Sequence, residues 1–230
     1  MKIHVIIPTY NRPQMLNRLL GNIERDQKGF DITIYMYNDH STLDYSIDFP
    51  NLNIRYYKAP KNHGKKMYWK LVNRMFKDVR HSDADYFFML ADDDILLKNF
   101  FSRVIKQWSA ITNDKKICLI PYIPKHRKGV PCWTKKEQLL INFGGYQIWN
   151  CGFVDMRFIC ERKFFEALGF RINPIPLDRW RKRPVSGSGV GQQISVRLVE
   201  RHNLYLCDED LVYQVPHNSL MNPQAEHLRK

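Results

Sequence analysis

Three consecutive aspartates, Asp92, Asp93 and Asp94, directly follow the apolar run 86–91. Such a run predicts a buried strand, and its carboxyl end is where open α/β sheets bind ligands. In an extended segment, residues two apart point the same way, so Asp92 and Asp94 can share a partner while Asp93 turns aside. Paired carboxylates suit Mg²⁺ or Mn²⁺, which often adds phosphate oxygens to its shell. The alternative is a solvated turn in which one aspartate caps the next helix; the position after a strand favours the metal.

Three other polar segments lie beside predicted strands or helices. The segment 8–12, PTYNR, leads into a helix, and backbone N–H groups near a helix start can bind a base or a phosphate. Asp39 follows the second predicted strand, where it can accept hydrogen bonds from a uracil or a ribose, or form an Asx turn. The segment 62–73 opens a helix with a glycine-containing turn. Each segment alone is equally compatible with an ordinary turn.

Alternating strand and helix patterns position these segments in the first hundred residues. Strands are predicted at 3–8, 32–37, 54–58 and 86–90, all apolar enough to be buried on both faces. Apolar residues at helical spacing follow Pro13 and recur in 67–79 and 101–111. This alternation predicts a parallel sheet wrapped by helices.

The second half of the sequence is more irregular. Strands are predicted near 117–123, 152–160, 204–207 and 211–215, and helices at 162–168 and about 191–201. Two long basic segments rich in Pro or Gly, 125–136 and 173–189, read as loops. Loops of this length in a compact domain are usually functional or disordered.

The composition indicates one large domain with an affinity for anions. The 230 residues include 36 basic and 23 acidic side chains, a net charge of +13, which attracts nucleic acid, anionic lipid headgroups or phosphorylated substrates. Five cysteines without a CxxC pair predict reduced thiols. No apolar window is long enough to span a membrane and no signal peptide is recognised, so a cytoplasmic protein is expected, in solution or at a membrane surface.

Four motifs in register resemble the GT-A fold glycosyltransferases, especially the large inverting family 2 of nucleotide-sugar enzymes. The resemblance covers the first hundred residues well and thins afterwards. It implies an α/β fold with a Rossmann-like, mostly parallel sheet flanked by helices and a smaller acceptor-side subregion. Residues 1–97 would form the nucleotide-sugar-binding half and 98–230 the acceptor-binding half of a single domain. The matching motifs are Pro8–Arg12, Asn38-Asp39-His40-Ser41, Asn62 with Gly64 and Asn73, and Asp92-Asp93-Asp94.

The resemblance also implies roles for individual residues. A nucleoside diphosphate sugar, expected to be a UDP-sugar, would be bound by Pro8, Thr9, Tyr10, Asn11, Arg12, Asp39, Asn62, Gly64, Lys65, Asn73, Asp92 and Asp93. Mn²⁺ or Mg²⁺ would be held by Asp92, Asp94 and His217, the last of these in a late strand that resembles one of the family. The metal would act as a Lewis acid on the leaving diphosphate.

One departure from the family concerns the general base. The family usually has a Glu-Asp pair where this chain has Gln192 and Gln193, and glutamine cannot take a proton, although it can orient a hydroxyl. Asp178 and Asp155 are the substitutes, with Gln193 in the orienting role. A retaining mechanism, which needs no such base, stays open.

Basic loops in the second half suggest an anionic acceptor. The acceptor-binding residues are expected to be Arg127, Lys128, Trp149, Arg179, Trp180, Arg181, Arg183 and Gln192. A tryptophan among cations can stack on a base or a sugar. The charge slightly favours a hydroxymethylated base in double-stranded DNA, a phage-type modification made in a host cytoplasm, over a lipid-linked or bacterial surface glycan at a membrane. An inactive nucleic-acid-binding module of the same fold is the alternative of another class.

Overall fold

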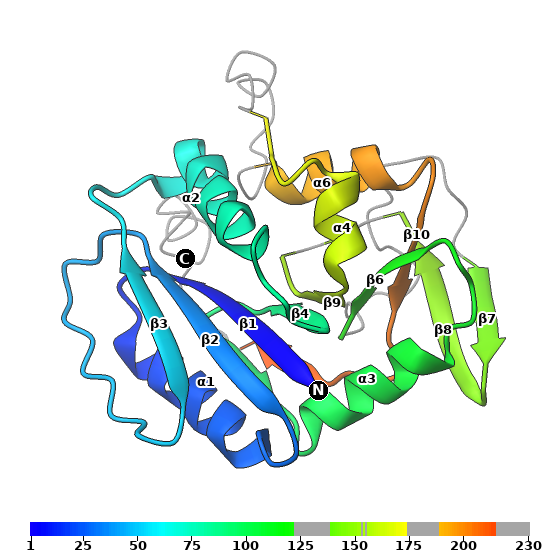
Figure 1. The fold of residues 1–230 in the computed structure, drawn as a ribbon, viewed down its shortest axis with the longest axis horizontal. Helices are drawn as coiled ribbons and strands as arrows, with labels where there is room; N and C mark the ends of the chain where they lie inside the picture. Colours follow the sequence, from blue (N-terminus) through cyan, green and yellow to red (C-terminus); the bar gives the residue numbers. More distant parts are fainter. Residues whose placement is uncertain (122–138, 153, 155, 174–188, 215–230) are drawn as a thin grey trace, which may run out of the picture.

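The computed structural model describes residues 1–230 except 122–138, 153, 155, 174–188 and 215–230, and only the backbone of residues 65 and 66. Its described strands form a nine-stranded sheet in the order β3-β2-β1-β4-β9-β6-β10-β8-β7 and a two-stranded sheet of β5 and β11 (Figure 1). Helices cover both faces of the large sheet, which confirms the α/β fold class.

The first half of the chain forms the parallel part of the sheet. Strands β1 and β2 pair from Lys2 opposite Asp31 to Thr9 opposite Asn38, and β4 lies on the other side of β1. The carboxyl ends of β1, β2 and β4 therefore meet at one edge of the sheet. The elements of this half are β1 (Lys2–Thr9), α1 (Pro13–Asp26), β2 (Asp31–Asn38), β3 (Asn53–Lys58), α2 (Gly64–Val79), β4 (Tyr86–Met89) and β5 (Asp94–Leu96).

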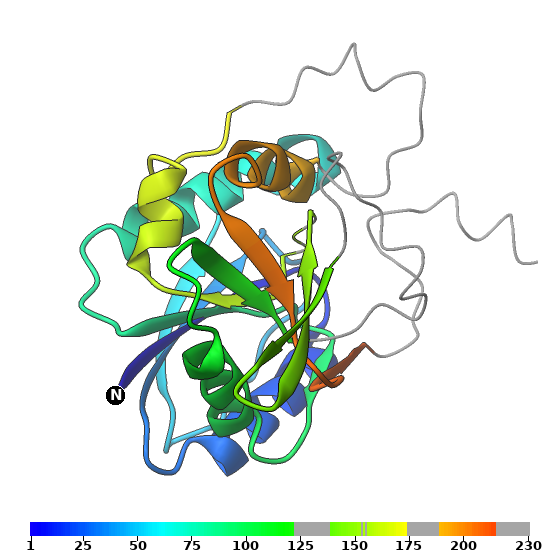
Figure 2. The same ribbon diagram turned by 90° about the vertical axis from the view of Figure 1, so that its right-hand side faces the viewer.

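The second half adds strands of both directions. Strand β9 runs antiparallel between β4 and β6, β6 and β10 are parallel, and the hairpin β7–β8 closes the far edge. Figure 2 shows this hairpin beside β10. The elements are α3 (Phe100–Ala110), β6 (Lys116–Ile120), β7 (Leu139–Phe143), β8 (Tyr146–Cys151), β9 (Phe158–Cys160), α4 (Arg162–Ala167), α6 (Val190–Leu198), β10 (Asn203–Leu206) and β11 (Val212–Gln214).

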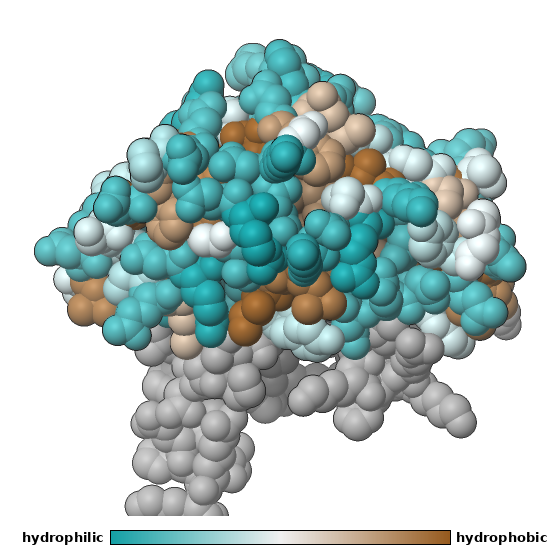
Figure 3. Space-filling view, turned by 90° about the horizontal axis from the view of Figure 1, so that it is seen from below, coloured by the Kyte–Doolittle hydropathy of each residue, from teal (hydrophilic) through white to brown (hydrophobic). Residues whose placement is uncertain are grey.

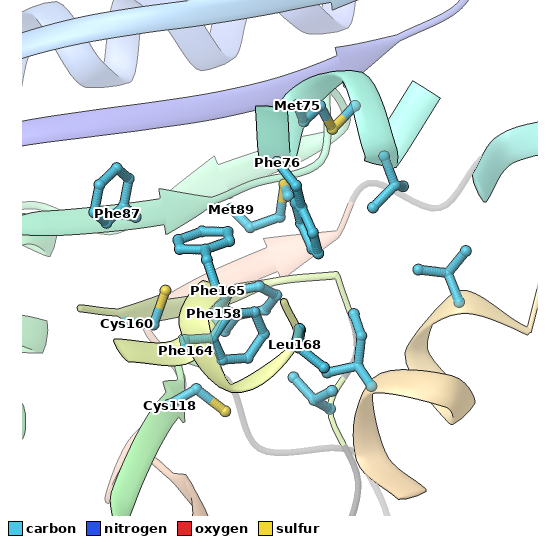
Figure 4. Packing of buried hydrophobic residues seen from close by; sticks show 14 of the residues in the cluster. Met75, Phe76, Phe87, Met89, Cys118, Phe158, Cys160, Phe164, Phe165 and Leu168 are labelled. Atoms are coloured by element: carbon cyan, nitrogen blue, oxygen red, sulfur yellow. The ribbon is translucent and has the colours of Figure 1, made fainter. Parts of the chain in front are cut away.

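Alternating side chains along the central strands build two cores. On β1, Ile3, Val5 and Ile7 face the core covered by α1 and α3, whereas Ile6 faces the core covered by α2, α4 and α6. The second core is rich in aromatic rings, and Phe165 of α4 lies among them (Figure 4). A sheet that is buried on both faces needs apolar residues at successive positions, which explains the unbroken apolar runs of β1 and β4.

Two predictions from the sequence are corrected by the structure, and one hairpin is added to them. Strand β3 is not buried on both faces, because it forms an edge of the sheet and four of its six residues are exposed. In the range 152–160, where a strand is expected, the described residues form strand only in β9. The hairpin β7–β8 was not predicted; its sequence, LLINFGGYQIWNC, does carry a Gly-Gly turn signal, and both glycines have positive φ.

The surface agrees with the polar composition of the chain. Figure 3 shows the side of the molecule that carries α1 and α3, where hydrophilic residues cover most of the visible face and hydrophobic ones form small separate areas. None of the helices in the described ranges combines the length and hydrophobicity needed to cross a bilayer.

Candidate functional site

The acid triplet lies at the carboxyl edge of the parallel strands, with Asp92 and Asp93 in a tight turn after β4 and Asp94 as the first residue of β5. The backbone N–H of Asp94 donates to the carbonyl of Ala91 at 3.1 Å, and the Asp94 carboxylate accepts the N–H of Ala91 at 2.8 Å. The three side chains are 6%, 2% and 0% exposed. The extended geometry expected from the sequence is therefore wrong, and a solvated turn is excluded as well.

Two arginines bracket the triplet. The Arg12 Nη1 atom donates to Asp92 Oδ1 at 3.1 Å and to Asp93 Oδ2 at 3.2 Å. On the other side, Arg157 Nε donates to Asp94 Oδ1 at 2.7 Å and Arg157 Nη2 donates to Asp93 Oδ1 at 3.2 Å. Asp93 does not turn aside, as the extended geometry had predicted, but joins both arginines.

Sequence reasoning singled out Arg12 and missed Arg157. Arg157 directly precedes β9, and the antiparallel pairing of β9 with β4 sets Phe158 opposite Met89, close to the start of the acid turn. The signal available in the sequence was an arginine within the strand predicted at 152–160. Only the pairing of that strand with β4 brings the guanidinium to the acids.

Burial leaves the triplet with uncompensated negative charge. Desolvation raises the pKa of Asp94 to about 6, although the Arg157 guanidinium opposes this shift. Desolvation likewise raises the pKa of Asp92 against the effect of Arg12. In the part of the chain that the structure describes, two guanidinium groups pair with three carboxylates, so among these five groups one negative charge is in excess in a poorly solvated position. Such a site favours one further cation.

The donor chemistry of the triplet fits a divalent metal. Carboxylate oxygens are the ligands that Mg²⁺ and Mn²⁺ prefer, and the excess negative charge suits a cation. Both oxygens of Asp93 and the Oδ1 atoms of Asp92 and Asp94 already accept hydrogen bonds from Arg12 or Arg157, so a metal at these atoms would compete with a guanidinium. The described residues contain no cluster of three or more His, Cys, Asp or Glu side chains arranged for metal binding, and His217 lies outside them.

The loop after β1 is tied to the triplet and to the neighbouring loop. Thr9 Oγ1 donates to Asp92 Oδ2 at 2.8 Å, and the Tyr10 backbone N–H reaches the same oxygen at 3.3 Å. Asn11 adopts a left-handed conformation, with φ of 52°, which asparagine tolerates better than most residues. Its Oδ1 atom accepts the Thr42 backbone N–H at 2.8 Å.

Tyr45 connects these loops and was missed by sequence reasoning. Its hydroxyl lies 2.9 Å from Thr9 Oγ1, accepts the Arg12 backbone N–H at 3.0 Å, and accepts the Ser41 hydroxyl at 3.2 Å. A single phenol therefore joins the ends of β1 and β2. No short motif predicts it, because the three partners come from two separate loops.

Asp39 binds the beginning of α2. Its Oδ1 atom accepts the His63 backbone N–H at 3.0 Å and lies 2.6 Å from His63 Nδ1, and its Oδ2 atom accepts the Gly64 N–H at 3.1 Å. Asn62 Nδ2 donates to the Asp39 carbonyl at 3.0 Å. The carboxylate therefore orients the His63 ring, leaving Nε2 as the nitrogen that faces other partners. His63 is the third residue, after Arg157 and Tyr45, that sequence reasoning missed.

Two predicted site residues are engaged away from the triplet. Asn73 exchanges two hydrogen bonds with the Ile172 backbone, at 2.7 and 2.9 Å. Gln193 does the same with the Asn173 backbone, at 2.8 and 3.2 Å. Both amides thus hold the segment that follows α4.

The remaining predicted residues are placed as follows. Pro8 belongs to β1 and pairs with Tyr37, and Trp149 on β8 packs, partly buried, against the core beneath α2, α4 and α6. The Gln192 Oε1 atom is buried without a hydrogen-bond partner among the described residues. The Lys65 backbone lies in the first turn of α2. Outside the described residues lie Asp155, Asp178, Arg127, Lys128, Arg179, Trp180, Arg181, Arg183 and His217.

Comparison of the sequence with protein families shows which family carries this site. A family described as glycosyl transferase family 2 matches residues 4–163, more than half of the chain. The chain belongs to glycosyl transferase family 2. The matched range includes the acid triplet, Asp39, His63 and both arginines, and membership confirms the resemblance seen in the four motifs. Comparison with curated protein sequences gives no significant match.

Solved structures share the fold of this family 2 chain. S. aureus TarS 1–349, in complex with UDP-GlcNAc, aligns with a TM-score of 0.61 and 16% identity over 97% of this chain and 61% of its own. The mannosyltransferase PcManGT from Pyrobaculum calidifontis, in complex with GDP-Man and Mn²⁺, aligns with a TM-score of 0.56 and 15% identity over 94% of this chain and 58% of its own. These likenesses confirm the GT-A fold. The family 2 chain spans about three fifths of the length of either protein.

Proposed function

We propose that this family 2 chain transfers a sugar from a nucleoside diphosphate sugar to a hydroxyl group of an anionic acceptor, with Mn²⁺ or Mg²⁺ as cofactor. The observation that carries the proposal is one buried acid triplet at the carboxyl edge of the sheet, contacted by the loop after β1 through Thr9 and Arg12 and by Arg157. Open α/β sheets bind their ligands at this edge. The comparison proteins were solved with UDP-GlcNAc and with GDP-Man and Mn²⁺, which supports a sugar nucleotide as the donor class.

The donor would lie across the ends of β1, β2 and β4. Asp39 and the loop 8–12 hold the nucleoside, and His63, oriented by Asp39, contributes a hydrogen bond to it. The diphosphate faces Asp92, Asp93 and Asp94, which would hold the metal, with His217 as a further ligand. When bound, the metal supplies Lewis-acid stabilisation of the diphosphate as it leaves.

The transfer forms a bond between the acceptor oxygen and the anomeric carbon of the sugar. The bond from that carbon to the diphosphate oxygen breaks, and its electron pair stays on the diphosphate. In an inverting reaction, the acceptor proton passes to a base, for which Asp178 and Asp155 are the candidates. Gln193 is engaged with Asn173, which supports a role in shaping the acceptor side over one in proton transfer.

The acceptor we propose is double-stranded DNA that carries a hydroxymethylated base. The net charge of +13 and the basic segments 125–136 and 173–189 support a polyanion, whose binding would come mainly from contacts with phosphates. A base hydroxyl would provide the attacking oxygen. An anionic glycan satisfies the same charge argument, and the acceptor assay below separates the two.

The donor half of the proposal predicts metal-dependent turnover of sugar nucleotides. With Mn²⁺ present, a panel of UDP- and GDP-sugars should include one that is hydrolysed slowly without acceptor, because water can replace the acceptor hydroxyl. Chelation by EDTA should abolish this turnover, and added Mn²⁺ should restore it. Release of UDP or GDP measures the rate. Turnover that survives chelation would contradict the requirement for a metal. If no donor is turned over or bound, the chain is not a glycosyltransferase of this kind, and the alternative of a nucleic-acid-binding module with the same fold is left.

The acceptor half predicts salt-dependent DNA binding. Duplex DNA should shift the protein in a gel at low salt, and the affinity should fall at least about tenfold between 50 and 200 mM salt if several phosphates are contacted. Mass spectrometry of hydroxymethylated duplex DNA and of anionic glycans, each incubated with mixed donors, should show a hexose or pentose adduct on the DNA. An adduct on the glycan alone, or DNA binding indifferent to salt, would overturn the DNA assignment.

A further inference from the structure

Arg157 reaches the acid triplet from the acceptor-side half of the fold. Its side chain is 14% exposed, and its Nε and Nη2 atoms lie 2.7 Å from Asp94 Oδ1 and 3.2 Å from Asp93 Oδ1. Arg12 approaches Asp92 and Asp93 from the other side, at 3.1 and 3.2 Å. The free protein therefore uses two guanidinium groups as internal counter-ions of the three acids.

A divalent cation competes with Arg157 for these carboxylate oxygens. A cation bound to Asp93 or Asp94 at the usual Mg²⁺ distance of about 2.1 Å would lie beside a guanidinium that already donates to the same atoms. The Asp94 side chain is 0% exposed, so water would screen the repulsion of these like charges poorly. Arg157 must therefore withdraw before a metal can take its place.

The anion that arrives with the metal offers Arg157 a new partner. A guanidinium presents its N–H groups as a planar fork, which matches the oxygens of a phosphate as well as those of a carboxylate. The two positive charges of the cation and the dianionic diphosphate of a sugar nucleotide cancel. The triplet with its arginines thus keeps the same single excess negative charge in the free and in the loaded site.

We propose that Arg157 changes partner when the donor binds: it holds Asp93 and Asp94 in the free protein and moves to the diphosphate as the metal takes these carboxylates. This inference rests on the proposed function and adds a residue to its diphosphate site. Metal and diphosphate then bind cooperatively, because the metal takes the carboxylates that Arg157 holds and the diphosphate gives Arg157 oxygens to bind in their place. Coupling of this kind is reciprocal between the two ligands.

Calorimetric titration tests the exchange without an activity assay. The probes are Mn²⁺ alone, and UDP or GDP with and without Mn²⁺, each titrated into the full chain. Arg157→Gln should bind Mn²⁺ alone at least about tenfold more tightly than the unchanged chain, because a competing cation is gone. It should bind the nucleoside diphosphate with Mn²⁺ about tenfold more weakly, since hydrogen bonds to a charged group are lost. For Arg157→Lys, both affinities should lie between those of the unchanged chain and those of Arg157→Gln.

A structural role alone gives a different pattern. If Arg157 only supported the turn, Arg157→Gln would weaken Mn²⁺ and nucleotide binding together, or change neither, and both results overturn the exchange. Arg55→Gln is the matched control, because Arg55 lies on edge strand β3 with its guanidinium over the Tyr35 ring; all its affinities should stay unchanged. If the unchanged chain binds no nucleoside diphosphate, the proposed function fails and the exchange with it. If the unchanged chain binds the nucleoside diphosphate and Arg157→Gln binds Mn²⁺ and nucleotide with the same affinities, the exchange of partners is contradicted and the proposed function is not.

Discussion

Replacement of Asp93 by asparagine is expected to lower kcat/KM for sugar transfer about 10³-fold, in the range seen when one electrostatic stabiliser of a transition state is removed. Asp93 is the acid that both arginines contact, so it lies at the centre of the charge that would hold the metal. The variant keeps the size of the side chain but removes the one excess negative charge. Initial rates of UDP or GDP release, with and without acceptor, measure the effect.

The fold should survive this change. Without the Asp93 charge, Arg12 still pairs with Asp92 and Arg157 still pairs with Asp94, so two guanidinium groups face two carboxylates. The thermal unfolding midpoint should therefore stay within a few degrees of the unchanged chain. Asp114→Asn removes the same charge at an exposed position between α3 and β6 and should leave the rate unaltered. A folded Asp93→Asn variant with near-normal turnover would show that the triplet has no part in the reaction.

Replacement of Phe165 by alanine is expected to lower the free energy of unfolding by about 3–5 kcal/mol. Phe165 is 0% exposed, and its ring centroid lies 5.1 Å from that of Phe76 on α2 and 5.1 Å from that of Phe87 on β4 (Figure 4). The change leaves a cavity where α4 joins α2 to the sheet. Urea unfolding followed by circular dichroism gives the free energy, provided that the slope with denaturant is unchanged.

An exposed hydrophobic residue serves as the control for this cavity. Leu139, at the start of β7, is 51% exposed, so Leu139→Ala removes little buried surface and should change the free energy of unfolding by at most about 0.5 kcal/mol. Equal losses for the two variants would mean that the aromatic core beneath α4 is not packed as the structure describes.

Local patterns in the sequence were sufficient for the parallel half of the fold. The apolar run at 3–8 and the helical spacing after Pro13 predicted β1 and α1 to within a few residues, because burial imposes its period on the chain. The same patterns put Thr9, Asp39 and Asp92 at strand ends, and parallel strands must then bring them to one edge. The edge that gathers these residues was therefore predictable from the sequence.

Sequence periodicity did not reveal which strand neighbours which. The exposure of β3 follows from its place at the edge of the sheet, and an apolar run reads the same at an edge as in the centre. The β7–β8 hairpin was missed because its two strands are only five and six residues long and their apolar and polar residues do not alternate regularly.

The charge balance of the acid triplet was decided by tertiary structure. The order of residues showed three aspartates, but the arginine that joins two of them lies more than sixty residues away and arrives only through the antiparallel pairing of β9 with β4. Tyr45 and His63 likewise act through contacts between separate loops. Residue types and spacing specify what a side chain can donate or accept; its partner depends on strand pairing, which is set by the packing of the whole sheet.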